Sequence, residues 1–231
     1  MLLERKITHT QPSRTFTTFP AQQYPNDCGA QALRQAAHEL KINEIPHSNL
    51  YLFSGQPISS SNAEDAIYGI TGDLLSIRGT SRVTQPHNGG YSYPANILKC
   101  ANQLGLDGRF YCSSLLTRIY MSTAYGKEWA EANQYSSINH CSPPVLYDNE
   151  RLLVVVNQGS QLHYIMQRPD KTCYDPATGS TYKTLKEYST TTHWKPSGIS
   201  ILVCNPEGYP AAPQPTSPDG ASTHQNSSQV T

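Results

Sequence analysis

The stretch QQYPNDCGAQALRQAAHEL, residues 22–40, predicts the helix around which the fold is built. Its apolar residues recur at helical spacing and form one face: Ala30, Leu33, Ala37 and Leu40. We expect the helix to run from Cys28 to Leu40, with Asp27 as its N-cap. Cys28 then lies in the first turn. Cys28 has two interpretations: it is a thiol activated at a helix N-terminus, or it is a small apolar residue in the core.

Composition excludes several kinds of partner. The chain has 231 residues and no net charge, and 15% of its residues are charged. Nucleic-acid binding needs a surplus of basic residues, so we expect no nucleic-acid partner. The longest apolar run, LLVVV at 152–156, is too short to span a membrane. No apolar signal-peptide region follows Met1, so we expect no classical export.

The six cysteines favour a reduced compartment over a disulfide framework. They stand at positions 28, 100, 112, 141, 173 and 204. A chain of this length does not need disulfides, and five cysteines cannot all pair if Cys28 stays free. There is no CxxC, P-loop or GxGxxG motif, and His140 beside Cys141 is the one close Cys/His pair. We therefore expect neither a metal nor a cofactor, and we interpret the other five cysteines as packing residues.

Patterning predicts one α+β domain between two unstructured ends. Residues 1–19 are expected to form a flexible arm, 20–204 the domain, and 205–231 a disordered tail rich in Pro and Ser. Besides the first helix, we predict helices at 95–104 and 126–135 and strands at 151–158, 161–167, 171–175 and 198–204. Helices thus come first and a mostly antiparallel sheet last. Residues 54–90 are expected to be a loop over the cleft or a variable insertion, with Leu74 and Leu75 left unassigned.

A reactive Cys28 needs a base, and His163 is the best of eight histidines. His9 and His224 lie in the expected unstructured ends, and His38 is about 15 Å along the helix from Cys28. His163 lies on a predicted strand and is followed by Asp175, which can orient an imidazole.

The loop between the two strands decides whether His163 and Asp175 meet. If residues 168–170, RPD, form a three-residue loop, Gln167 faces Lys171 and His163 lies directly opposite Asp175. A two-residue loop would put the two side chains on opposite faces. Structural roles also stay open, with His163 as an ordinary strand histidine and Asp175 as a turn former in DPATG.

The segments QQYPNDCGAQAL, HYIM and YDPATG resemble the papain-like cysteine peptidases. The similarity is closest to the group that processes bacteriocin leaders in ABC exporters. It implies a papain-like fold, with Cys28 as nucleophile, His163 as general base and Asp175 as its orienter. It also implies Gln22 as the side-chain oxyanion donor, with the adjacent Gln23 as the alternative. Cys28 precedes His163 by 135 residues, within the roughly 130–150 of papain-type enzymes.

These features predict a cysteine protease that cleaves a protein or peptide through a thioester acyl-enzyme. Without exporter domains, the chain resembles free-standing effector proteases that bacteria deliver into other cells. We expect a monomer that acts on a host protein in the host cytosol, or else a cytoplasmic enzyme. Two alternatives keep the scaffold: a glutamine deamidase or transglutaminase with the same three residues, and an inactive peptidase-like binding protein.

Overall fold

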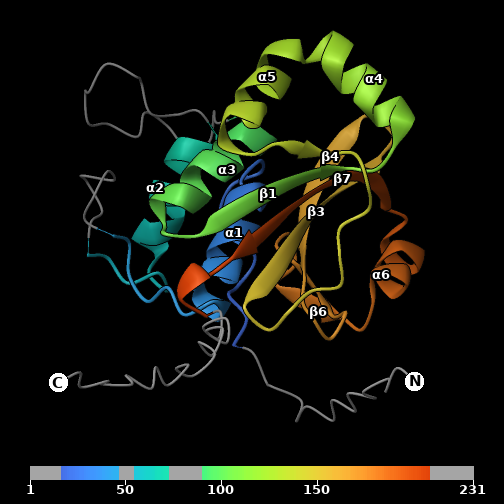
Figure 1. The fold of residues 1–231 in the computed structure, drawn as a ribbon. Coiled ribbons are helices and arrows are strands. Elements are labelled where there is room, and N and C mark those ends of the chain that lie inside the picture. Colours follow the sequence, from blue (N-terminus) through green and yellow to red (C-terminus); the bar gives the residue numbers. More distant parts are fainter. Residues whose placement is uncertain (1–16, 47–54, 73–89, 209–231) are drawn as a thin grey trace, which may run out of the picture.

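The computed structural model describes residues 17–46, 55–72 and 90–208, and within them it confirms the α+β class (Figure 1). The helices are α1 (Cys28–Glu39), α2 (Ser61–Thr71), α3 (Pro94–Gln103), α4 (Leu115–Ala124), α5 (Gly126–Tyr135) and α6 (Leu185–Thr192). The strands are β1 (Asp107–Cys112), β2 (Ile138–Asn139), β3 (Glu150–Gln158), β4 (Gln161–Gln167), β5 (Cys173–Asp175), β6 (Ser180–Tyr182) and β7 (Lys195–Cys204). A short 3₁₀ helix, Pro206–Gly208, follows.

The strongly patterned elements agree with the predictions, and the weakly patterned ones were missed. Helices α1, α3 and α5 and strands β3, β4, β5 and β7 lie where the sequence indicated them, within a few residues. Helix α2 lies inside 54–90, so the expectation of a loop is wrong for 61–71, and the alternative of a variable insertion stays a prediction. Leu74 and Leu75 lie outside the described residues.

The seven strands form one mixed sheet in the order β2-β1-β7-β3-β4-β5-β6. Strands β1 and β2 are parallel, and the other neighbours are antiparallel. Strand β1 lies between α3 and α4 in the chain but pairs with β7 along six residue pairs. The prediction that the sheet follows all the helices is therefore wrong, because the last strand, β7, pairs with β1, which lies among the helices in the chain.

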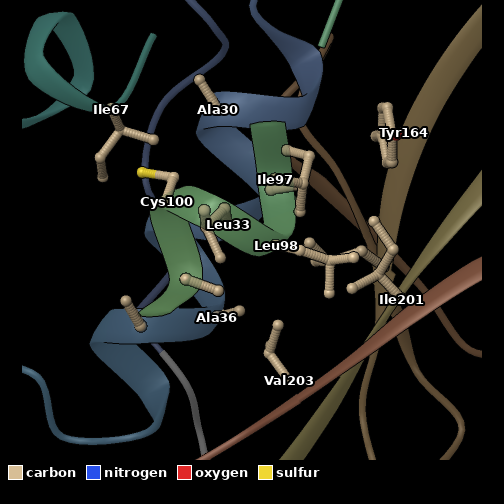
Figure 2. Packing of buried hydrophobic residues seen from close by; sticks show 14 of the residues in the cluster. Ala30, Leu33, Ala36, Ile67, Ile97, Leu98, Cys100, Tyr164, Ile201 and Val203 are labelled. Carbon is tan, nitrogen blue, oxygen red and sulfur yellow. The ribbon is translucent and has the colours of Figure 1, made fainter. Parts of the chain in front are cut away.

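Helix α1 is buried between the sheet and the other helices. Along α1 every residue except His38 is buried. Figure 2 shows its Leu33 and Ala36 packed with residues of α3 and β7: Ile97, Leu98, Ile201 and Val203. Full burial of each large aliphatic side chain is worth about 1.5–3 kcal/mol, so this layer holds α1 firmly on the sheet.

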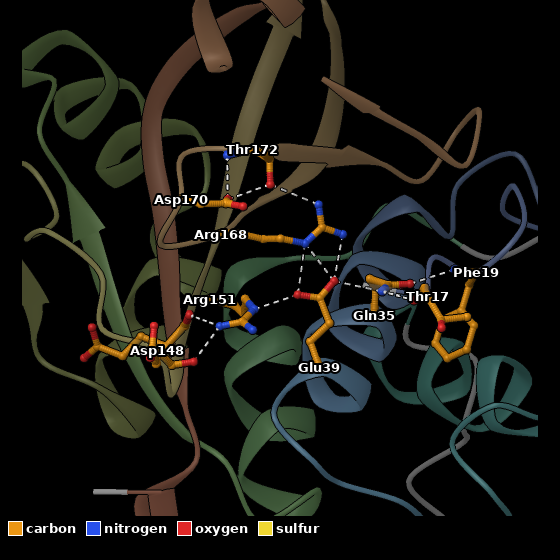
Figure 3. Close-up of polar contacts among 10 residues, drawn as sticks. Thr17, Phe19, Gln35, Glu39, Asp148, Arg151, Arg168, Asp170 and Thr172 are labelled. Atoms are coloured by element: carbon orange, nitrogen blue, oxygen red, sulfur yellow. Dashed lines mark hydrogen bonds and ion pairs between the residues drawn. The ribbon is translucent and has the colours of Figure 1, made fainter. Parts of the chain in front are cut away.

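The buried polar residues of α1 are satisfied by distant segments. Glu39 accepts hydrogen bonds from Arg151 of β3 and from Arg168 at the end of β4 (Figure 3). Gln35 bonds to Phe19 N and Thr17 O. Phe19, in the segment expected to be an arm, is thus buried against α1.

The other face of the sheet has its own apolar layer. It is lined by Leu152, Val154 and Ile165 and covered by Tyr188 of α6, with Trp194 packed at its edge. Among the described residues, no helix combines the length and the apolar character needed to cross a membrane.

Candidate active site

Cys28 is the first residue of α1 and is 3% exposed. Asp27 occupies the N-cap position, as predicted, but its side chain makes no capping hydrogen bond. The first helical bond runs from Gln31 N to Asp27 O. The N–H groups of Cys28 and Gly29 therefore have no acceptor within the helix, and the helix dipole adds positive potential there. A thiolate or an oxyanion is stabilised at such a position.

Gly29 is required by packing. A Cβ on Gly29 would lie 2.4 Å from Ser92 Cβ and 3.2 Å from Ile97 Cδ1. Ser92 and Ile97 therefore leave no room for a larger residue at position 29.

His163 contacts both Asp175 and Cys28. Its Nε2 lies 2.7 Å from Asp175 Oδ1, and its side chain also makes a hydrogen bond with the Cys28 side chain. Burial lowers the pKa of His163, but the bonds to Asp175 and Cys28 outweigh burial and raise this pKa from 6.5 to about 9. The imidazole is therefore protonated at neutral pH. An imidazolium is the form that stabilises a neighbouring thiolate.

Asp175 is held by the turn that follows it. Its Oδ1 accepts a hydrogen bond from Ala177 N at 2.9 Å, and its Oδ2 accepts one from Thr178 Oγ1 at 3.4 Å. The interpretation of Asp175 as a turn former and its contact with His163 are therefore compatible, since one carboxylate makes both sets of bonds.

The β4–β5 loop differs from the prediction by one residue. Arg168 N donates to Thr172 O, so the loop is residues 169–171, with Lys171 at φ 71°. It has three residues, as expected, but begins one residue later than RPD. Gln167 therefore faces Cys173, and the predicted pairing with Lys171 is wrong.

This later loop changes how His163 and Asp175 meet. Met166 pairs with Tyr174, and continuing this register puts Asp175 opposite Ile165. His163 lies two residues before Ile165 on β4, so it shares a face with Asp175. The two side chains meet diagonally, and the prediction that they lie directly opposite is wrong. A shift of two residues preserves the face, whereas a shift of one would not.

Trp194 is a neighbour of the site that the sequence reasoning missed. Its ring lies 5.5 Å from the His163 ring, centroid to centroid, at an interplanar angle of 52°. It precedes β7, and no local pattern marks it, because only the sheet order brings the start of β7 toward His163.

The two candidate oxyanion donors, Gln22 and Gln23, both already make side-chain hydrogen bonds. Gln22 Nε2 donates to Tyr24 O at 2.7 Å and to Pro25 O at 3.2 Å, and Gln22 Oε1 is buried without a hydrogen-bond partner. Gln23 Nε2 donates to Glu64 Oε2 at 3.1 Å. Gln22 N also donates to Pro176 O at 2.8 Å, which joins this segment to the turn after Asp175.

The remaining histidines and cysteines lie elsewhere or outside the described residues. Those outside are His9, His47, His87 and His224. Four of the other cysteines are buried, as the packing interpretation requires, but Cys141 is exposed, so for it that interpretation is wrong. Within residues 17–46, 55–72 and 90–208, no three side chains of the metal-binding types cluster.

Comparison with known proteins assigns the chain to a family. The family model described as "Invasion plasmid antigen J, cysteine protease" matches residues 21–206. The chain is 27% identical over 206 residues to cysteine protease IpaJ of Shigella flexneri, covering 80% of this chain and 77% of that protein. No solved structure matches. The predicted class, a cysteine peptidase, is thereby confirmed. The chain belongs to the invasion plasmid antigen J family of cysteine proteases.

Proposed function

We propose that the protein is an effector protease in which Cys28, His163 and Asp175 act together on a peptide bond. The observation that carries this proposal is the pair of contacts made by His163, with Cys28 at the start of α1 and with Asp175. The order of these residues, on a helix, a strand and the next strand, also supports the papain-like assignment.

The contacts assign a role to each group. The Cys28 Sγ attacks the scissile carbonyl carbon, and the protonated His163 donates a ring proton to the leaving amine. The resulting thioester on Cys28 is attacked by a water molecule that gives a proton back to His163. Release of the carboxylic acid regenerates the thiolate and the imidazolium. Asp175 holds the ring and stabilises its positive charge throughout.

The first turn of α1 supplies the most direct oxyanion donor. The N–H of Cys28 has no acceptor within the helix and adjoins the thiol. Gln22 is the proposed side-chain donor, and it must first release Tyr24 O or Pro25 O. Gln23 is the weaker candidate, because both its backbone N and its Nε2 donate to Glu64.

The relative's name suggests the biological setting. The Shigella flexneri protein is a cysteine protease of an invasion plasmid antigen family. We propose that this chain is secreted and cleaves a protein of an invaded cell, in the cytosol of that cell. The deamidase, transglutaminase and inactive-scaffold alternatives are not favoured by a family of proteases.

Product analysis tests the reaction. The full chain and its Cys28→Ala variant are incubated with a pool of peptides from a eukaryotic cytosol, and the products are identified by mass spectrometry. We expect new peptide termini with the native chain and none with Cys28→Ala. Cys141→Ala, which removes an exposed thiol, is the matched control and should cleave like the native chain. A gain of about one dalton without cleavage would assign a deamidase, and equal cleavage by Cys28→Ala would overturn the proposal.

A further inference from the structure

Glu64 of α2 binds the segment that precedes Cys28. The Glu64 side chain is 1% exposed. Its Oε1 accepts a hydrogen bond from Gln23 N at 2.9 Å, and its Oε2 accepts one from Gln23 Nε2 at 3.1 Å. Arg34 of α1 forms an ion pair with the same Oε2 at 2.7 Å. A carboxylate 41 residues away in the chain thus holds the backbone and side chain of Gln23.

Asp27 contacts Glu64 from the same segment. Asp27 is completely buried, and its Oδ2 accepts a hydrogen bond from Tyr24 N at 3.2 Å. Its Oδ1 is buried without a hydrogen-bond partner among the described contacts, and the Asp27 side chain lies within hydrogen-bonding reach of the Glu64 side chain. Two buried carboxylates in contact cannot both carry a charge without a large penalty. One proton on Asp27 Oδ1, donated to Glu64, satisfies the unpaired atom.

The neighbouring charges decide which carboxyl group keeps the proton. Arg34 is paired with Glu64 and also donates to Ile58 O and Ser59 O, so Glu64 is the group stabilised as an anion. Burial and the contact with Glu64 raise the pKa of Asp27 from 3.8 to about 8. The titratable groups that interact with Asp27 are Glu64 and Tyr68 from α2, Arg34 from α1, and Tyr24 from its own segment, whose hydroxyl also donates to Asp65.

We propose that Asp27 and Glu64 form an acid–carboxylate pair that positions residues 22–27, and with them the start of α1, for the reaction at Cys28. Both are positioning residues, because they act through Gln23 and the backbone before Cys28. The assignment rests on the proposed function for its effect on catalysis. The shared proton itself does not depend on catalysis.

The pair has a defined pH dependence. In the unfolded chain Asp27 ionises near 3.8 and in the folded chain near 8, so the folded state holds an extra proton between these values. The free energy of unfolding therefore falls as the pH rises through this window. Above about pH 8, both Asp27 and Glu64 are ionised and repel each other, which loosens residues 22–27.

Asp27→Asn is the decisive variant. An asparagine reproduces the protonated acid, since its Nδ2 can donate to Glu64 while its Oδ1 accepts from Tyr24 N. We expect the stability of Asp27→Asn, measured by denaturant unfolding, to exceed that of the native chain by a margin that grows from pH 5 to pH 8. Asp107→Asn, at an exposed position on β1, is the matched control and should follow the native curve. Parallel curves for Asp27→Asn and the native chain would overturn the shared proton.

Peptide cleavage gives the second readout. The alkaline fall of kcat/KM should begin near pH 8 in the native chain and move toward the His163 value of about 9 in Asp27→Asn. Glu64→Ala, which releases Gln23, should lower kcat/KM on the order of 10²-fold. An unmoved alkaline limb would overturn the positioning role. A divergence of the stability curves without any cleavage activity would instead leave the pair intact and reject the proposed protease.

Discussion

Arg168 donates three hydrogen bonds to Glu39, at 2.7–3.0 Å, and so ties the end of α1 to the β4–β5 hairpin (Figure 3). Helix α1 begins at Cys28, and the hairpin carries His163 and Asp175. These two elements therefore meet at both ends, through the Cys28–His163 contact at one end and the Glu39–Arg168 contact at the other. This double attachment fixes how far His163 can move from Cys28.

Glu39→Gln should destabilise the fold strongly. Glu39 is bonded to Arg151 as well as to Arg168, and both guanidinium groups are buried. Removing the anion leaves two buried cations without their counter-charge, which costs about 3–5 kcal/mol. Denaturant unfolding measures the loss. Glu44→Gln, at an exposed position beyond α1, is the control, and we expect a change within about 0.5 kcal/mol. Equal effects of the two variants would refute the role of the Glu39 contacts.

Asp175→Asn should impair catalysis much more than folding. The asparagine Oδ1 can still accept from Ala177 N, so the turn is preserved, but the negative charge beside His163 is lost. We expect kcat/KM to fall on the order of 10²–10⁴-fold and the pKa of His163 to drop. Asp170→Asn is the matched control, because Asp170 bonds to Thr172 within the same hairpin without contacting His163. Similar kinetics for the two variants would contradict the proposed orienting role.

His163 should make stability depend on pH in the alkaline range. Its folded pKa of about 9 lies above the value of 6.5 in the unfolded chain. Its contribution is therefore complete below pH 6.5 and is lost as the pH rises through about 9. Unfolding curves of the native chain and of His163→Gln measure it, and their difference should shrink over this range. A constant difference would mean that His163 is not held as a cation.

Gly179→Ala should disturb both stability and activity. Gly179 has φ +69°, and a Cβ there would lie 3.1 Å from Ala21 N and 3.2 Å from Phe19 O. Gly159 has φ +61° with nothing within 4 Å, so Gly159→Ala carries only the conformational cost of about 1–2 kcal/mol. We expect Gly179→Ala to lose more stability than Gly159→Ala. It should also lower kcat/KM, because the added Cβ displaces the backbone at residues 19–21, which precede Gln22. Calorimetry and peptide cleavage compare the two variants, and equal losses would contradict a role for this close approach.

Local patterns predicted the elements that carry the site, and distant contacts explain the rest. The helix from Cys28 and the strand with His163 have strong apolar periodicity, so they were predictable. The burial of the polar residues of α1 was not predictable, because nothing local indicates that the segment around Phe19 covers Gln35. Helix α2 has few strongly apolar residues, so no apolar pattern predicted it. Its Glu64 binds Arg34 and Gln23, which are distant in the sequence.

The contact between His163 and Asp175 was predicted on a partly wrong basis. The loop length was correct but its position was not, and the shared face survived because the register moved by two residues. The turn at Lys171 requires a positive φ in a residue that rarely adopts it, so the sequence offered no signal for it. The role of Gln22 remains a prediction, and its present bonds to Tyr24 O and Pro25 O define what must change on substrate binding.

The rate at which each cysteine is alkylated tests the central claim most directly. The folded chain is treated with limiting iodoacetamide at pH 6, and the modified cysteines are quantified by peptide mass spectrometry. If His163 and the start of α1 activate Cys28, Cys28 reacts before the exposed Cys141 despite being 3% exposed, and His163→Gln removes this preference. Alkylation of Cys141 ahead of Cys28 in the native chain, or an unchanged preference in His163→Gln, would contradict the account.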